Sequence, residues 1–229
     1  MKIASYNIRK CIGLDRRRDP KRVLSVIKEL PVDVIALQEV DKRLGKRPSS
    51  IPFDQIEIQT GMQPITFDRS GSSLGWHGNT FLVKPNVSIT DIECIDLPGL
   101  EPRGAIIAEV HLSGTTPFQL IATHLGLLRK NRIRQLTYIQ DALANRTDLP
   151  TIIMGDFNEW SQTAGLAAIT NKFNILAPGN SFHAARPIAK LDRFALSKNL
   201  HVKDAGVLTT RLARKASDHL PIWAEVVQA

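Results

Sequence analysis

Short apolar runs that end at polar or turn-forming residues recur along this chain, and they constrain the fold more than any other feature. Five stand out, at residues 3–6, 34–37, 105–108, 120–122 and 151–154, and three more follow at 194–196, 202–208 and 220–227. Runs of this length are typical of strands buried on both faces, or of sheets packed on each other and covered by helices. The order of the elements predicts a layered α/β protein with many strands and few helices.

Two segments have the pattern of amphipathic helices. For residues 20–30, Asp19 is the expected N-cap, Pro20 occupies the first turn and Pro31 stops the helix. The second helix is predicted at residues 129–144, with an apolar face formed by Leu128, Ile133, Leu136, Ile139 and Leu143. Shorter helices are expected at 53–60 and 162–169.

Composition and the lack of repeats or linkers limit the class of protein. Hydrophobic residues make up 43% of the 229 positions, which excludes global disorder, and the absence of repeats and linkers favours one domain over residues 1–229. Cys11 and Cys94 have no metal-ligand spacing, so a disulfide framework and a thiolate zinc site are not expected. With no apolar run of 18 residues and no signal-peptide core, we expect a soluble, cytoplasmic monomer.

A formal net charge of +8 favours contact with polyanions such as nucleic acid, acidic lipid surfaces or phosphate esters, without choosing among them. Basic clusters at 42–47 and 129–134 follow shortly after two of the apolar runs. Solvated helix faces explain most such clusters. The alternative is a positive rim around an anion-binding pocket.

Polar residues come directly after four of the apolar runs: Asn7, the pair Gln38 and Glu39, the pair Thr123 and His124, and the segment 155–158. Polar side chains at the carboxyl ends of core strands are held by a rigid sheet and open onto its edge, where ligands commonly bind. Taken singly, each could be an ordinary solvated strand end. If several of the strands are parallel, however, these residues meet in one place.

Two of the polar segments suggest specific chemistry. Asp156 and Asn158 share a face if the backbone stays extended, which suits them to hold a water molecule, although an Asx-type turn is the simpler interpretation. Near the C-terminus, a carboxylate at Asp192 would orient the imidazole of His219 and leave Asp218 for metal or water. A surface histidine beside a cap is the alternative for His219.

These segments together resemble the ordered motifs of the endonuclease/exonuclease/phosphatase superfamily. The resemblance rests on YNIR at 6–9, LQEV at 37–40, THLG at 123–126, GDFN at 155–158, LDR at 191–193 and SDHLP at 217–221. A further string, EPRG at 101–104, resembles a bacterial branch of the superfamily. The resemblance implies a DNase I-like, four-layer α/β/β/α sandwich with metal-dependent hydrolysis of phosphate esters at one end of its two sheets.

The resemblance also implies a role for each matched residue. Glu39 is the expected main Mg²⁺ ligand, with Asn7 and Asp218 contributing and Mn²⁺ as an alternative ion. Asp156 and Asn158 are expected to align or deprotonate the attacking water, and Asp192 to orient His219. His219 is also a candidate general base in the family, and the sequence does not divide that role between it and Asp156. Phosphate oxygens would be bound by His124, His219, Asn7 and Arg103, with an auxiliary substrate-side role for Asn79. One departure is Arg193-Phe194, where relatives often have an aromatic residue or His followed by Ile.

Three functional hypotheses remain at this stage. The first is a Mg²⁺-dependent phosphodiesterase or phosphatase on a small or lipid-derived phosphoester, with peripheral membrane contact as an option. The second is a nuclease on DNA or RNA, which is weakened because only Trp76, Phe157 and Trp160 offer aromatic rings near the motifs. The third, a non-catalytic phosphate-binding module, need not retain both a metal carboxylate and water-positioning groups.

Overall fold

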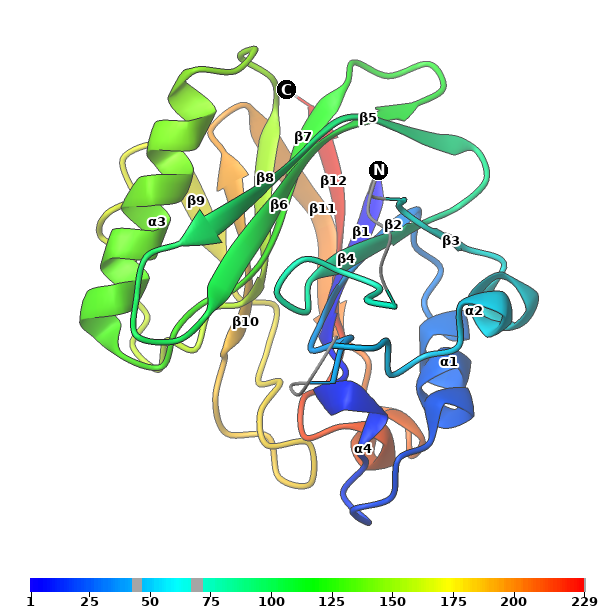
Figure 1. Ribbon diagram of the computed structural model, residues 1–229. Coiled ribbons are helices and arrows are strands. Elements are labelled where there is room, and N and C mark those ends of the chain that lie inside the picture. Colours follow the sequence, from blue (N-terminus) through cyan, green and yellow to red (C-terminus); the bar gives the residue numbers. More distant parts are fainter. Residues whose placement is uncertain (43–46, 67–71, 229) are drawn as a thin grey trace.

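The computed structural model describes residues 1–42, 47–66 and 72–228 (Figure 1). Its first sheet has the strand order β11-β12-β1-β2-β4-β3. The strands are β1 (Lys2–Asn7), β2 (Val34–Gln38), β3 (Gln63–Pro64), β4 (Thr80–Val83), β11 (Leu200–Val207) and β12 (Ile222–Gln228). Strands β1 and β2 are parallel, with Asn7 opposite Gln38, and β12 pairs with β1 in the antiparallel sense.

The second sheet has the order β5-β6-β7-β8-β10-β9. It contains β5 (Val87–Leu97), β6 (Arg103–Leu112), β7 (Phe118–His124), β8 (Thr151–Asp156), β9 (Phe173–Leu176) and β10 (Asp192–Ser197). Here β7 and β8 are the parallel pair, with His124 opposite Asp156. Strand β10 runs antiparallel to β8 and places Asp192 opposite the same Asp156.

The two sheets pack face to face and helices cover their outer faces, which confirms the predicted four-layer α/β/β/α sandwich (Figure 1). Residues such as Ile3 and Phe81 from the first sheet meet Ile106 and Leu120 from the second in one core between the sheets. The outer faces are covered by α1 (Pro20–Lys28), α2 (Phe53–Thr60) and α4 (Ala213–Ala216) on the first sheet and by α3 (Arg129–Ala144) on the second. Central strands are therefore buried on both faces, which explains their continuous apolar runs.

Helix α1 begins as predicted and ends earlier. Asp19 caps it by accepting a hydrogen bond from the Arg22 backbone N–H at 3.1 Å. The helix ends at Lys28 rather than at residue 30, since the Glu29 and Leu30 amides bond three residues back and tighten the last turn. Pro31 explains why no further turn follows.

Helix α3 has the predicted bounds, Arg129–Ala144, but part of its predicted apolar face is wrong. Leu136 and Ile139 are buried, whereas Leu128 and Ile133 are 53% and 38% exposed. Polar side chains take the inward positions of the first turns because they bind the loops beside the site. Gln135 Oε1 accepts from the Gly126 amide at 2.8 Å, and Arg132 donates to the Gly126 carbonyl at 3.2 Å.

The helix expected at 162–169 is wrong. This segment is a series of turns in which Leu166 bonds to Thr163 and Ile169 to Leu166, three residues apart rather than four. It wraps over the Glu159 carboxylate so closely that a Cβ on Gly165 would lie 1.8 Å from it. Among the described residues, the structure contains no helix with the length and apolar character needed to cross a membrane.

Candidate active site

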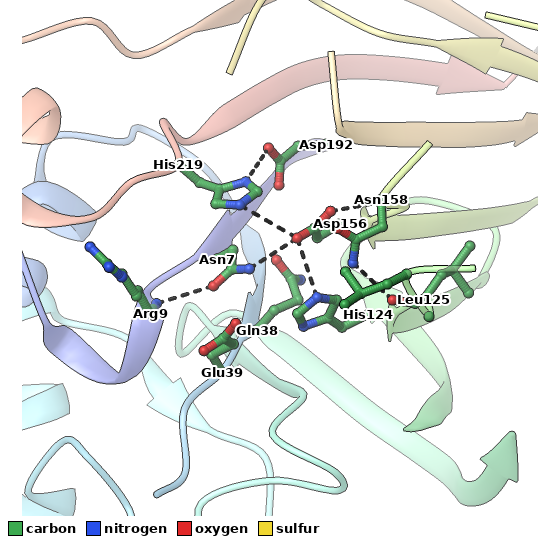
Figure 2. A network of polar contacts seen from close by, with 12 residues as sticks. Asn7, Arg9, Gln38, Glu39, His124, Leu125, Asp156, Asn158, Asp192 and His219 are labelled. Atoms are coloured by element: carbon green, nitrogen blue, oxygen red, sulfur yellow. Dashed lines mark hydrogen bonds and ion pairs between the residues drawn. The ribbon is translucent and has the colours of Figure 1, made fainter. Parts of the chain in front are cut away.

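The strand ends singled out in the sequence meet at one end of the two packed sheets (Figure 2). Asn7 closes β1, His124 closes β7, Asp156 closes β8 and Asp192 opens β10. His219 lies in the segment that leads into β12. Because β1–β2 and β7–β8 are parallel, the carboxyl ends of both pairs open onto this edge, as the sequence predicted.

A network of buried polar side chains connects one sheet to the other at this edge (Figure 2). His219 Nδ1 lies 2.8 Å from Asp192 Oδ2, and its Nε2 lies 3.6 Å from Asp156 Oδ2. His124 Nε2 lies 3.3 Å from that same Asp156 oxygen, and Asn7 Nδ2 donates to it at 3.0 Å. The predicted pairing of Asp192 with His219 is confirmed.

The two histidines have opposite electrostatic environments. Burial lowers the pKa of His124 to about 3, and the attraction of Asp156 only partly offsets it. Burial also lowers the pKa of His219, but the carboxylates of Asp192 and Asp156 outweigh it and raise that pKa to about 10. Near neutral pH, His219 is therefore a cation that is hydrogen-bonded to Asp192 and ion-paired with Asp156, while His124 is neutral.

The turn at 155–158 differs from the predicted extended backbone. Asn158 has a φ of +50°, its amide N–H donates to Asp156 Oδ1 at 2.9 Å, and its side-chain Nδ2 donates to the Leu125 carbonyl at 2.9 Å. The expectation that Asp156 and Asn158 share a strand face is wrong, and the Asx-type turn is what forms. Gly155 is required because a Cβ there would lie 1.8 Å from the Thr123 carbonyl oxygen.

The residues predicted to bind metal lie on the β1–β2 side of the site. Glu39 follows the strand partner of Asn7 and has a left-handed backbone, with φ +55°. Lys10 forms an ion pair with its carboxylate. Arg9 Nε lies 3.2 Å from Asp218 Oδ2, and the Arg9 amide donates to Asn7 Oδ1 at 3.1 Å. The acidic groups thus face cationic side chains from the turn after β1.

Among the described residues, Asp156, Asp192 and His219 form a group with metal-ligand spacing, and their ligand atoms lie within 4.8 Å of one another. All three are buried. The sequence resemblance assigns metal binding to Glu39, Asn7 and Asp218 instead. In the group that the structure brings together, His219 already contacts both carboxylates.

A pocket of about 350 Å³ adjoins the buried polar network around Asp156. His124 belongs to both, because it contacts Asp156 and also lines the pocket. Glu39 and Arg103 line the pocket as well, and Arg103 Nη2 lies 2.9 Å from the Glu101 carboxylate. Glu101 also accepts from the Leu127 amide at 3.2 Å, which fastens the loop after β7 to the EPRG string.

Asn79 lies behind the pocket rather than in it. The residue is fully buried, and its Nδ2 donates to the carbonyls of Trp76 and Gly104 at 3.2 and 3.1 Å. Because Asn79 is fully buried, its predicted auxiliary role on the substrate side would act through the segments that it holds together. Its amide attaches the turn at 76–79 to the start of β6.

The departure at Arg193 has a structural explanation. This arginine is 1% exposed and donates to the carbonyls of Glu159 and Ser161 at 2.6 and 2.9 Å. The Glu159 carboxylate in turn binds Arg132 at 2.7 Å and Arg129 at 3.4 Å. The cluster at 129–134 is therefore partly directed inward, to support the loop after Asp156, and only in part forms an exposed basic rim. In the other cluster, Lys42 and Arg47 line the pocket and 43–46 lie outside the described residues.

Sequence reasoning missed several residues of this region. Lys10 pairs with Glu39, Ser181 donates to Asp192, and His77 and Glu101 line or shape the pocket. Glu101 belongs to the EPRG string, so its position beside Arg103 was a usable signal. The contributions of Lys10, Ser181 and His77 depend on loops whose course no periodicity reveals.

Comparison with known proteins places this fold and site in a class of metal-dependent phosphoric ester hydrolases. The model of the endonuclease/exonuclease/phosphatase family matches residues 4–219, and the chain belongs to that family. It is accordingly an enzyme of this class, and the hypothesis of a non-catalytic module is not supported. No curated protein matches the chain.

Solved structures share the fold along the whole chain at low sequence identity. A conserved protein of unknown function from Enterococcus faecalis V583 has 23% identity, a TM-score of 0.80 and coverage of 100% of both chains. A mannosyl-6-phosphatase from Bacteroides thetaiotaomicron VPI-5482 has 20% identity, a TM-score of 0.76 and 99% coverage of both. D. rerio TDP2 in complex with a single-stranded DNA product has 18% identity, a TM-score of 0.75 and coverage of 100% of this chain and 99% of that one.

Proposed function

We propose that this protein is a Mg²⁺-dependent phosphodiesterase that hydrolyses a small or lipid-derived phosphodiester. One observation carries the proposal: His124 contacts Asp156 and also lines the pocket, so it links the buried polar network to the pocket that contains Glu39 and Arg103. A volume of about 350 Å³ falls in the range of small-molecule sites, about 300–1,000 Å³. It suits one compact ester group better than an extended duplex.

The donor atoms on the β1–β2 side fit Mg²⁺. Glu39 and Asp218 offer carboxylate oxygens and Asn7 an amide oxygen, which are the hard ligands that this ion prefers, and Mn²⁺ accepts the same set. The contacts of Lys10 with Glu39 and of Arg9 with Asp218 support the suitability of both acids for a cation. When bound, the ion supplies neutralisation of the phosphate charge.

The remaining side chains divide the chemistry between them. Asp156, held by Asn7 and His124, is the group suited to accept the proton of the attacking water. His219, kept cationic by Asp192, is suited to donate to a phosphate oxygen as negative charge grows there. In this arrangement Asp156, rather than His219, is the general base. Arg103, fixed by Glu101, adds a further donor from the pocket wall.

A substrate panel tests the proposal directly. Purified protein is incubated with bis(4-nitrophenyl) phosphate, 4-nitrophenyl phosphate, a phospholipid dispersion and supercoiled plasmid, each with Mg²⁺, Mn²⁺ or EDTA. We expect release of 4-nitrophenol from the diester with either ion and none in EDTA. Hydrolysis of the monoester alone would show a phosphatase instead. Turnover that is unchanged in EDTA would contradict the assigned metal dependence.

A nuclease is the second candidate, and one observation favours it. Trp160 is 63% exposed and its ring lies 6.2 Å from that of Phe182, which in turn lies 4.9 Å from the His219 imidazole. Exposed aromatic rings beside a phosphate site can stack on a nucleic-acid base. Nicking of the plasmid that is lost in the Trp160→Ala variant, with diester hydrolysis retained, would favour this function over the first.

A further inference from the structure

Part of the pocket wall is not used by the proposed chemistry, and this part is positively charged. Lys42 and Arg47 line it together with His77. Elsewhere on the wall, Lys10 pairs with Glu39 and Arg103 pairs with Glu101. Within residues 1–42, 47–66 and 72–228, by contrast, Lys42 and Arg47 form no salt bridge with a carboxylate. This part of the wall therefore carries two cationic side chains that no described carboxylate binds directly, and Asp41, which also lines the pocket, acts on Arg47 only through space.

A relay of side chains fixes Arg47 in place. Arg47 Nη1 lies 3.3 Å from His77 Nδ1, and His77 Nε2 lies 2.8 Å from Asp96 Oδ1. Since an arginine nitrogen can only donate, His77 Nδ1 is the acceptor and its Nε2 carries the proton toward Asp96. The imidazole also packs edge-on against Trp76, with ring centroids 4.7 Å apart. Arg47 is thus oriented by a side chain that is itself held on two sides.

The turn that holds His77 also packs against residues next to Glu39 and Arg103. A Cβ on Gly104 would lie 2.7 Å from His77 Cδ2 and 2.8 Å from Trp76 Cδ1, so only glycine lets this turn pack against β6. Gly104 directly follows Arg103, and Asn79 bonds its carbonyl. On the other side, the Val40 amide donates to the Gly78 carbonyl at 3.0 Å, next to Glu39. The turn at 76–79 therefore connects the neighbourhood of Glu39 with that of Arg103, and its His77 contacts Arg47.

Lys42 is brought beside Arg47 by a short antiparallel pairing. Asp41 is bridged to Ser49, and the Lys42 amide donates to the Pro48 carbonyl at 2.9 Å. The neighbouring Asp41 carboxylate is engaged elsewhere, since it accepts hydrogen bonds from the Ser73 hydroxyl and from the Leu74 and Gly75 amides.

We propose that Arg47 and Lys42 form a second phosphate subsite, so that the substrate carries a terminal phosphate monoester on a group attached to the scissile phosphate. A phosphate monoester has a charge near −2 at neutral pH, which matches two cations, and the planar guanidinium of Arg47 can bind two of its oxygens. This inference rests on the proposed phosphodiesterase function and specifies its substrate class. Arg47 is then a determinant of specificity.

A pair of matched substrates tests the subsite. One is the 4-nitrophenyl diester of glycerol 1-phosphate, and the other is the same molecule with a phosphate on the terminal hydroxyl of the glycerol. We expect kcat/KM to be about tenfold or more higher for the second, mainly through KM, because hydrogen bonds to charged groups are stronger than those between neutral groups. In Arg47→Ala this ratio should fall to about one. In Arg47→Lys, which keeps the charge without the planar fork, it should be intermediate.

Exposed Arg16 lies outside the pocket, so Arg16→Ala is the matched control and should keep the full preference. Equal kcat/KM for the two substrates in the wild type, or an undiminished preference in Arg47→Ala, would overturn the subsite while leaving the diesterase function intact. If neither diester is hydrolysed, the proposed function fails, and the subsite is then judged by calorimetry. Tighter binding of glycerol 1,3-bisphosphate than of glycerol 1-phosphate, lost in Arg47→Ala, supports it, and equal binding rejects it.

Discussion

The floor of the site and its outer pocket are built by different means. The floor consists of His124, Asp156, Asp192 and His219, each at most 6% exposed and each placed by a strand end or the approach to a strand. The pocket is lined largely by loop residues, in which salt bridges and a histidine relay replace strand pairing. A rigid floor fixes the reacting groups, whereas a wall of loops can change its selectivity without altering the chemistry.

The largest effect should come from the floor. In Asp156→Asn the proposed base is lost, so kcat should fall by about 10²–10⁴-fold. The amide still fills the space between Asn7 and the two histidines, so the far-UV circular dichroism should not change. Steady-state kinetics on a 4-nitrophenyl diester provide the measurement. Asp204→Asn, on the exposed part of β11, is the control and should retain full activity. An Asp156→Asn enzyme with normal kcat would remove this residue from the chemistry.

Glu39 lies where floor and pocket meet, and its replacement should have the next largest effect. Glu39→Gln removes one carboxylate from the proposed Mg²⁺ ligands and leaves Lys10 beside a neutral amide. We expect about a 10²-fold loss of kcat/KM at limiting Mg²⁺, partly recovered as the ion concentration rises. Rates measured across a Mg²⁺ titration distinguish this from a simple loss of turnover. Glu57→Gln, on the solvent side of α2, should titrate like the wild type.

The opposed histidines of the floor predict a stability that declines on both sides of about pH 6.5. His219 has a folded pKa of about 10, above its unfolded value, so its stabilisation is complete below about pH 6.5 and is lost as the pH rises toward 10. His124 has a folded pKa of about 3, so its contribution is present above about pH 6.5 and is lost as the pH falls toward 3.

Urea unfolding in EDTA from pH 5 to 9 checks this expectation. The free energy of unfolding should drop on the order of 2 kcal/mol toward each end of that range. His219→Gln should flatten the alkaline side and leave the acidic side as it is. His201→Gln, exposed on β11, serves as the control. An unchanged alkaline limb in His219→Gln would show that His219 is not charged in the folded protein.

The contrast between floor and pocket also separates what the sequence could predict from what it could not. Asn7, His124 and Asp156 were found because each ends an apolar strand, and strand order then brings them together. The pattern of apolar runs did not reveal strand β5, because its central positions, such as Asp91 and Glu93, are exposed and polar. Lys10 and His77 acquire their contacts through turns with positive φ, and no periodic pattern encodes the path of those turns.

Long-range charge pairs were equally inaccessible from the sequence. Arg193 lies next to Asp192 in the chain, yet its partners are carbonyls of the loop at 159–161. Glu159 and Arg132 are 27 residues apart in the sequence, and they meet only because α3 packs beside the loop that follows β8. The fold class, the strand ends and the Asp192–His219 pair could be predicted because they depend on local pattern and on the family motifs. The supporting contacts depend on packing.

The smallest effect should come from a conservative change in the pocket wall. In Arg103→Lys the positive charge remains, but an ammonium cannot reproduce the two contacts that Arg103 makes with Glu101. We expect KM for the diester to rise about tenfold with kcat nearly constant, because the wall binds substrate while the floor performs the chemistry. Arg186→Lys, outside the pocket, should leave both parameters unchanged. A fall in kcat comparable to that of Asp156→Asn would instead assign Arg103 to the transition state and move the boundary between floor and wall to include it.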